Sequence, residues 1–284
     1  MKQQVLLLLL LSCSAGLFAQ EKEAEKKEKY WKDNLDLSLV FSEGNTISNT
    51  FSLKNKLSYE KDKHKFVFGV LTIHKDITSE TETAVQQDDG SIDFTKVSDT
   101  VTIEEKYGAR VGYERLLKKH WFFQANADWY RDRFSGVNSR VSAHAGIGRY
   151  LVKTDKRVFK IGVAAGYTME DLTVEGNEKD DFFSPVVNYE WTIKINPKAA
   201  FEQKLEMIGN GSDSNDLRGL LDTNLANKFN DHIALKAGLF LLWDNEPALV
   251  DVALTNTAGE TLDPISVESD KLDSVFTMSL SIFF

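Results

Sequence analysis

The feature that most constrains the fold is an alternation of apolar and polar residues that begins near Trp31 and continues to the C-terminus. Residues 35–41, Leu-Asp-Leu-Ser-Leu-Val-Phe, carry a large apolar side chain at every second position. Successive side chains of a strand point to opposite faces, whereas a helix would spread the same residues around its circumference. The pattern therefore predicts an all-β chain.

The alternation divides into twelve segments, most of them longer than the roughly 5–6 residues typical of strands in soluble proteins. Their lengths suit the roughly 9–11 residues that a tilted strand needs to cross a bilayer. An even number of strands also lets a closed barrel keep both termini on one side. The predicted strands are 33–42, 46–59, 66–77, 100–116, 121–134, 139–152, 157–170, 182–195, 199–209, 216–226, 233–244 and 271–284.

The connections between these segments are sorted by length. Those on the side of the termini are short, and those on the other side include three long predicted loops, 78–99, 171–181 and 245–270. Short periplasmic turns and longer external loops are typical of outer-membrane barrels. We therefore expect a transmembrane up-and-down antiparallel β-barrel of about 12 strands. A soluble periplasmic barrel or sandwich is the alternative.

The first residues resemble an export signal. Lys2 precedes an apolar run from Val5 to Leu11, and Ala19 offers a cleavage site. We expect a signal peptide over 1–19, a charged periplasmic tail over 20–30 and a barrel over 31–284. A lipoprotein processed at Cys13 is the alternative.

The last strand predicts partners. Large apolar residues occupy every second position from Phe276 to the terminal Phe284, which resembles the signal that barrel-assembly machinery reads. Aromatic residues near both ends of the strands are typical of contacts with outer membrane lipids. The expected location is the cell outer membrane of a Gram-negative-type envelope. A net charge of −9 argues against nucleic acid as a partner.

Several short motifs carry a resemblance to a known family. They are Gly44-Asn45-Thr46, Tyr130-Arg131-Asp132-Arg133-Phe134, Gly146-Ile147-Gly148-Arg149-Tyr150 with Thr154-Asp155, and Trp243-Asp244-Asn245-Glu246-Pro247. In this order, they make the chain similar to the uncharacterised family that includes the salt-induced outer membrane proteins. The resemblance implies an outer-membrane β-barrel of unknown function with a link to salt. The long segments 78–99 and 245–270 depart from a compact member of that family.

The polar strand faces predict the content of the lumen. Their charged residues carry nearly equal numbers of each sign, and a charge inside a barrel needs a partner or water because desolvating it alone costs several kcal/mol. Balanced signs favour an ionic network across the lumen that narrows or closes it, with a narrow aqueous channel as the alternative. The predicted network residues are Glu104, Lys106, Arg110, Glu114, Asp128, Arg140, Glu190, Glu202, Lys204, Arg218 and Asp222, joined by Lys160, Lys194, Glu206 and Lys236.

The charges of the three long predicted loops are almost all acidic. One hypothesis is a surface that gathers divalent cations, and the alternative is a solvated, repelling surface. Asp88, Asp89 and Asp93 around Gly90 form a weak calcium candidate, because they supply oxygen ligands and a turn but lack a closing bidentate Glu. No cofactor is expected.

The sequence does not favour an enzyme. Three of the five histidines lie among lysines at the short turns, and Ser142 and His144 share a strand face in a way that ordinary polar lumen filling explains. We expect a non-enzymatic envelope protein, structural or cation-interacting, in envelope or salt adaptation. A narrow small-solute channel is the alternative, and a lipid-acting outer-membrane enzyme is a less favoured one.

Overall fold

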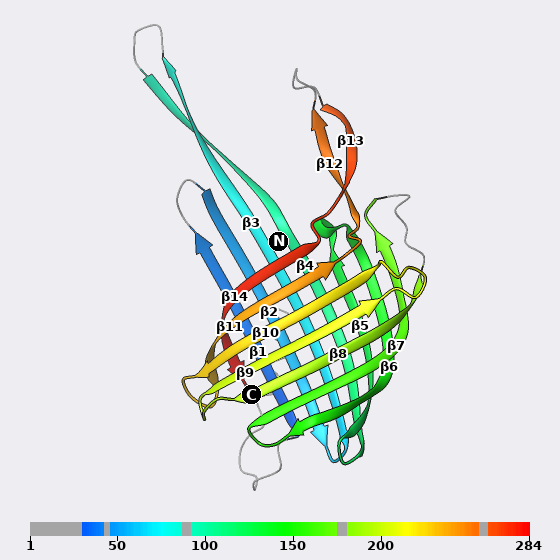
Figure 1. The fold of residues 1–284 in the computed structure, drawn as a ribbon. Helices are drawn as coiled ribbons and strands as arrows, with labels where there is room; N and C mark the ends of the chain where they lie inside the picture. The colour runs from blue at the N-terminus through cyan, green and yellow to red at the C-terminus, as the bar shows by residue number, and fades with distance from the viewer. Residues whose placement is uncertain (1–29, 43–45, 87–91, 175–180, 256–260) are drawn as a thin grey trace. The chain divides into compact units, whose positions relative to one another are not determined.

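The structure, a computed structural model, describes residues 30–42, 46–86, 92–174, 181–255 and 261–284, and residues 31–284 form one compact unit. Within this unit twelve antiparallel strands close into a barrel, because β1 pairs with both β2 and β14 (Figure 1). The barrel strands are β1 (Trp31–Ser42), β2 (Thr46–Lys61), β3 (His64–Gln86), β4 (Ile92–Lys118), β5 (Trp121–Asp132), β6 (Val137–Lys153), β7 (Arg157–Leu172), β8 (Phe182–Lys194), β9 (Ala199–Gly209), β10 (Leu217–Lys228), β11 (Ile233–Asp244) and β14 (Leu272–Phe283). The predicted fold class, an all-β up-and-down barrel of about 12 strands, is confirmed.

The prediction of a loop over 78–99 is wrong. β3 and β4 continue as a paired arm, from Glu80 opposite Ser98 to Gln86 opposite Ile92. Along this arm the two strands pair only with each other, since β2 follows β3 only as far as Ser79 (Figure 1). The arm is rich in Thr, Ser and acidic residues. Neither of its faces is shared with the barrel wall, so it lacks the apolar and polar alternation from which the barrel strands were predicted.

The prediction of a loop over 245–270 is also wrong in part. It contains a second hairpin, β12 (Leu249–Thr255) and β13 (Thr261–Glu268), which forms its own two-stranded sheet. The base of this hairpin packs on Gly136, whose φ is +78°, and a Cβ at Gly136 would lie 2.7 Å from the carbonyl oxygen of Leu249. Glycine is therefore required there both for its backbone conformation and for the close approach.

The predicted signal peptide, 1–19, lies outside the described residues, as does most of the predicted tail, 20–30. In the part of the chain that the structure covers, no helix has the length and apolar character needed to cross a membrane.

The barrel has an apolar outside and a polar inside. On β8, Val187 is 58% exposed on the outer face, whereas Ser184 is fully buried on the inner face. The last strand repeats this arrangement, with Phe276 exposed outside and Ser281 buried inside. A soluble protein rarely exposes so continuous an apolar surface, and a transmembrane barrel places it against lipid. The fold is thus of the transmembrane type.

Small residues line the wall formed by β6 and β7. A Cβ added at Gly166 would lie 1.8 Å from the carbonyl oxygen of Ala143, and one at Gly148 would lie 2.2 Å from the ring of Phe122. Glycine inside a strand often marks a tight bend of a barrel wall. These two positions admit no side chain without a shift of their neighbours.

Candidate functional site

The candidate site is the barrel lumen, where charged side chains from opposite walls meet. Lys54 on β2 binds Asp222 on β10, with its Nζ 2.5 Å from Oδ2. Lys56, also on β2, binds Glu202 on β9 at 3.3 Å. Strands β1, β14 and β11 separate β2 from β10 around the wall, and β10 must also be passed to reach β9. Both ion pairs therefore cross the lumen rather than follow its wall.

A third bridge approaches from the other side. The guanidinium of Arg110 on β4 donates to Glu206 on β9 at 2.7 Å and binds Asp128 on the neighbouring β5 at 3.1 Å. Four strands, β5 to β8, lie between β4 and β9. Arg110 thus links two carboxylates that belong to opposite parts of the wall.

Nearer the short turns, lysines bind carboxylates on the inner faces of the strands. Lys160 binds Glu114 at 2.7 Å and Glu190 at 3.3 Å, and the Tyr150 hydroxyl also donates to Glu114. Lys204 binds Glu202 at 3.0 Å. This level of the lumen is therefore also held by ion pairs.

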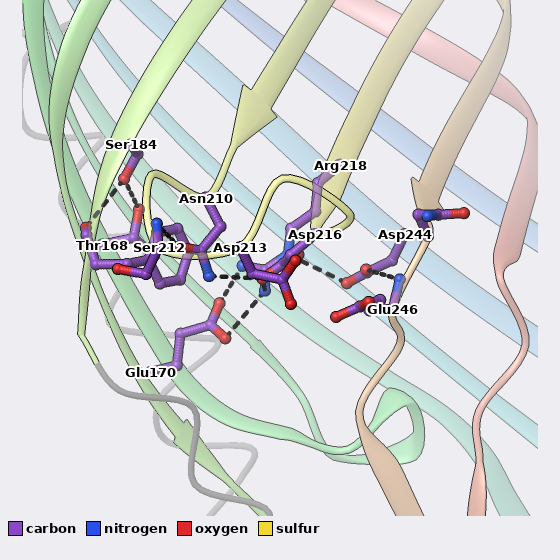
Figure 2. Close-up of polar contacts among 12 residues, drawn as sticks. Thr168, Glu170, Ser184, Asn210, Ser212, Asp213, Asp216, Arg218, Asp244 and Glu246 are labelled. Atoms are coloured by element: carbon purple, nitrogen blue, oxygen red, sulfur yellow. Dashed lines mark hydrogen bonds and ion pairs between the residues drawn. The ribbon is translucent and has the colours of Figure 1, made fainter.

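A buried cluster lies at the opposite end, where the long connections begin (Figure 2). The carboxylate of Glu170 is fully buried and receives hydrogen bonds from both Arg140 and Arg218. Arg218 also donates to Asp216 at 2.9 Å and lies 3.3 Å from Asp244. Burying a lone carboxylate costs several kcal/mol, so the two guanidinium groups are what make the position of Glu170 possible.

A second cluster at this end surrounds Lys106, whose Nζ lies 3.2 Å from Asp132 and 3.0 Å from Asp273. Asp132 is fully buried and caps the short 3₁₀ helix η1 (Arg133–Ser135) through the backbone N–H groups of Phe134 and Ser135. The Ser135 hydroxyl donates to Asp132 and to Asp273. The contacts to Asp273 tie the end of β5 to the start of β14, although four strands, β4 to β1, lie between them around the wall.

The ion pairs do not fill the lumen completely. A cavity of about 440 Å³ remains, and its lining extends from Lys65, beside a short turn, to Asp273 at the far end. Lys54, Arg110 and Glu206 line the same cavity. The lumen is therefore both bridged and hollow, with its free space bordered by charged groups.

The structure brings every predicted network residue except Lys194 into at least one ion pair. Of the predicted members not yet placed, Glu104 lies 3.5 Å from Lys106, and Lys236 binds Asp36 of β1. Lys194 lies exposed at the end of β8 and forms no ion pair with any residue that the structure describes.

Sequence reasoning missed several partners in the network. Lys54 and Lys56 belong to the polar face of a predicted strand, so the alternation that revealed the other members also applied to them. The same holds for Asp36 in the middle of β1. The remaining missed partners lie close to strand ends, where the inward face is hard to assign from sequence. They are Asp132, Glu170, Asp216, Asp244 and Asp273.

The residues of the predicted calcium site lie largely outside the part of the chain that the structure describes. Asp88 and Asp89 are not among the described residues, and of Asp93 only the backbone is described, on β4 opposite Val85. Among the residues whose placement is described, no group of three or more His, Cys, Asp or Glu side chains is arranged to hold a metal ion.

Comparison with known proteins gives a family and several solved barrels. No curated protein matches the chain. The NanC porin structure has a TM-score of 0.44 and 10% identity, covering 88% of this chain and 98% of its own. An anion-selective porin from Comamonas acidovorans has a TM-score of 0.39 and 6% identity, covering 89% and 98%. A Pseudomonas aeruginosa FadL homologue has a TM-score of 0.33 and 11% identity, covering 84% and 68%.

The family model described as "Protein of unknown function, DUF481" matches residues 35–257. The match begins within β1 and extends through β11 into the β12–β13 hairpin. The chain belongs to this family of unknown function.

Proposed function

We propose that the protein is a non-enzymatic β-barrel of the outer membrane whose lumen is closed by ion pairs, with a structural or cation-interacting role in envelope or salt adaptation. The observation that carries the proposal is the set of bridges between opposite walls, Lys54–Asp222, Lys56–Glu202 and Arg110–Glu206. A selective pore would instead be expected to line its bore with an excess of one charge. Paired charges across the lumen hold the two walls together and obstruct passage.

The apolar outer face supports the membrane location, and the apolar alternation of β14 up to Phe284 supports insertion by barrel-assembly machinery. The strongly acidic composition of 78–99 and 245–270 supports contact with divalent cations.

Fractionation tests the location, since the protein should stay with the membrane until detergent is added. Release by a high-salt or urea wash without detergent would contradict it.

Planar-bilayer recording tests the closed lumen. The refolded protein should add no stable unit steps of conductance. The triple variant Lys54→Ala, Lys56→Ala, Arg110→Ala should conduct, because three bridges are removed. A matched triple variant at exposed turn positions, Lys63→Ala, Lys119→Ala, Lys198→Ala, should remain silent. Stable unit steps from the unaltered protein would reject the closed lumen.

A narrow small-solute channel is the second candidate, and the cavity of about 440 Å³ is the observation in its favour. Its lining reaches from Lys65 at one end of the barrel to Asp273 at the other. Unit conductance in the unaltered protein would select this function.

The envelope role has its own test in cells. A strain that lacks the protein should grow more poorly than its parent when NaCl is raised or when a chelator removes divalent cations. Restoration by the intact gene should reverse the defect. Equal growth of both strains under both conditions would count against a role in salt or cation adaptation.

A further inference from the structure

We propose that the half of the lumen cavity nearer the short turns binds a small oxyanion, the phosphate or carboxylate group of a solute. The proposal requires the barrel and its cavity, but it does not depend on whether the lumen conducts. It concerns a group of lysines that have few carboxylates within ion-pair distance.

The lysines with the fewest direct carboxylate contacts are Lys56, Lys204 and Lys65. The Nζ atoms of Lys56 and Lys204 both bind Oε1 of Glu202, at 3.3 and 3.0 Å, so two ammonium groups share one carboxylate oxygen. Lys65 forms no ion pair with any residue in the described ranges, and its side chain lies on the inner face of β3. Three ammonium groups therefore have one carboxylate within ion-pair distance, since Glu114, opposite Lys65 on the next strand, is bound by Lys160.

The neighbouring lysines differ from this group because each has its own carboxylate. Lys54 binds Asp222 at 2.5 Å, and Lys160 binds both Glu114 and Glu190. At the far end of the lumen, Arg140 and Arg218 share the buried Glu170, and Arg218 also meets Asp216. An added anion would thus find ammonium groups with few direct carboxylate contacts mainly at the turn-side lysines.

These lysines are accessible from the cavity. Lys56, Lys65 and Lys204 all line it, and the side chains of Lys56 and Lys204 are 35% and 33% exposed. A water molecule takes up about 30 Å³ in the liquid, so a cavity of about 440 Å³ can hold a small anion with part of its hydration shell. Lysine ammonium groups bind phosphate and carboxylate as compact point charges.

A second observation, independent of the lysines, is a buried hydrogen-bond donor in the cavity wall, the Gln124 amide beside Gly162 of β7, that lacks an acceptor. Gln124 lines the cavity and is 8% exposed, and its amide Nε2 has no hydrogen-bond partner in the described structure. Through strand pairing Gln124 lies opposite Glu114, which in turn lies opposite Lys65. A buried donor without a partner costs about 1–3 kcal/mol, and an oxyanion offers only acceptors.

Calorimetric titration of the full barrel, refolded in a nonionic maltoside at low ionic strength, tests the proposal. The two probes are pyrophosphate and citrate, which distinguish a phosphate from a carboxylate ligand. We expect saturable binding of at least one of them. Affinity should fall about tenfold in Lys65→Gln and in Lys56→Gln, the loss expected for one charged hydrogen bond. Added NaCl should weaken binding by screening.

Lys63→Gln is the matched control, because it removes the same charge from the exposed turn two residues before Lys65 and should leave affinity unchanged. Gln124→Leu keeps all charges and should also weaken binding, which separates a built site from general attraction to a basic surface. Absence of saturable binding of both probes would overturn the proposal. Equal affinity in Lys65→Gln, Lys56→Gln and the unaltered protein would overturn it as well. Neither result bears on the conductance that tests the closed lumen.

Discussion

Lys54 and Asp222 meet across the lumen at 2.5 Å although 168 residues separate them in sequence and three strands separate them around the wall. Asp222 also accepts a hydrogen bond from Asn224 at 2.7 Å. The pair is partly exposed to the cavity, which screens its attraction, yet each charge would lose its nearest partner if the other were removed.

Removal of either partner should therefore destabilise the barrel modestly. We expect Lys54→Met or Asp222→Asn to lower the free energy of unfolding by about 1–2 kcal/mol, the range left after solvent screening. The double variant should recover part of this loss, because no unpaired charge remains. Urea unfolding in detergent, followed by tryptophan fluorescence, provides the measurement. Lys63→Met at the exposed turn is the control, and purely additive single effects would show that the two side chains are not coupled.

The crowded wall between β6 and β7 predicts an unequal response to the same substitution at two glycines. Gly166→Ala should destabilise the barrel by roughly 1–3 kcal/mol, since its Cβ would fall 1.8 Å from a backbone oxygen. Gly69→Ala should change stability by no more than about 0.5 kcal/mol, because its nearest neighbour would be 3.7 Å away. The folded fraction can be read from gel mobility before and after heating. Similar losses in both variants would contradict the close packing at Gly166.

The apolar outer face predicts a dependence on depth in the bilayer. Val187 lies in the middle of β8 and Ile195 just beyond its end, and both are 58% exposed. Val187→Arg should cost about 2–4 kcal/mol and Ile195→Arg about 0–1 kcal/mol, as expected for the midplane and the interface. Unfolding from lipid vesicles measures both. Equal costs would mean that lipid does not cover the wall as proposed.

The two hairpins predict a pattern of proteolysis. If the long connections face outward, a broad-specificity protease added to intact cells should cut within 78–99 or 245–270. The lysine-rich short turns around Lys63 and Lys119 should resist trypsin until the outer membrane is opened. Cleavage at those turns in intact cells would reverse the orientation.

Local sequence patterns were sufficient for the barrel strands, because lipid on one side and polar lumen on the other impose a period of two. The same rule could not predict the arm formed by β3 and β4 or the β12–β13 hairpin. Their paired strands extend past the barrel wall, so apolar residues were not required on alternate positions and their backbone hydrogen bonds alone define them. Both were accordingly expected to be loops.

In the lumen, too, some features follow from the sequence alone and others from the tertiary structure. The sequence by itself determined most of the charged residues that face inward and that charges of both signs occur among them. Only the tertiary structure decided that Arg110 reaches Glu206, that Glu170 binds two arginines, and that Lys65 forms no ion pair with any described residue. The reason is that strand pairing is local and follows the chain, whereas contacts across a barrel depend on its curvature and on the stagger of its strands. The spacing of residues along one strand determines neither the curvature of the barrel nor the stagger of its strands.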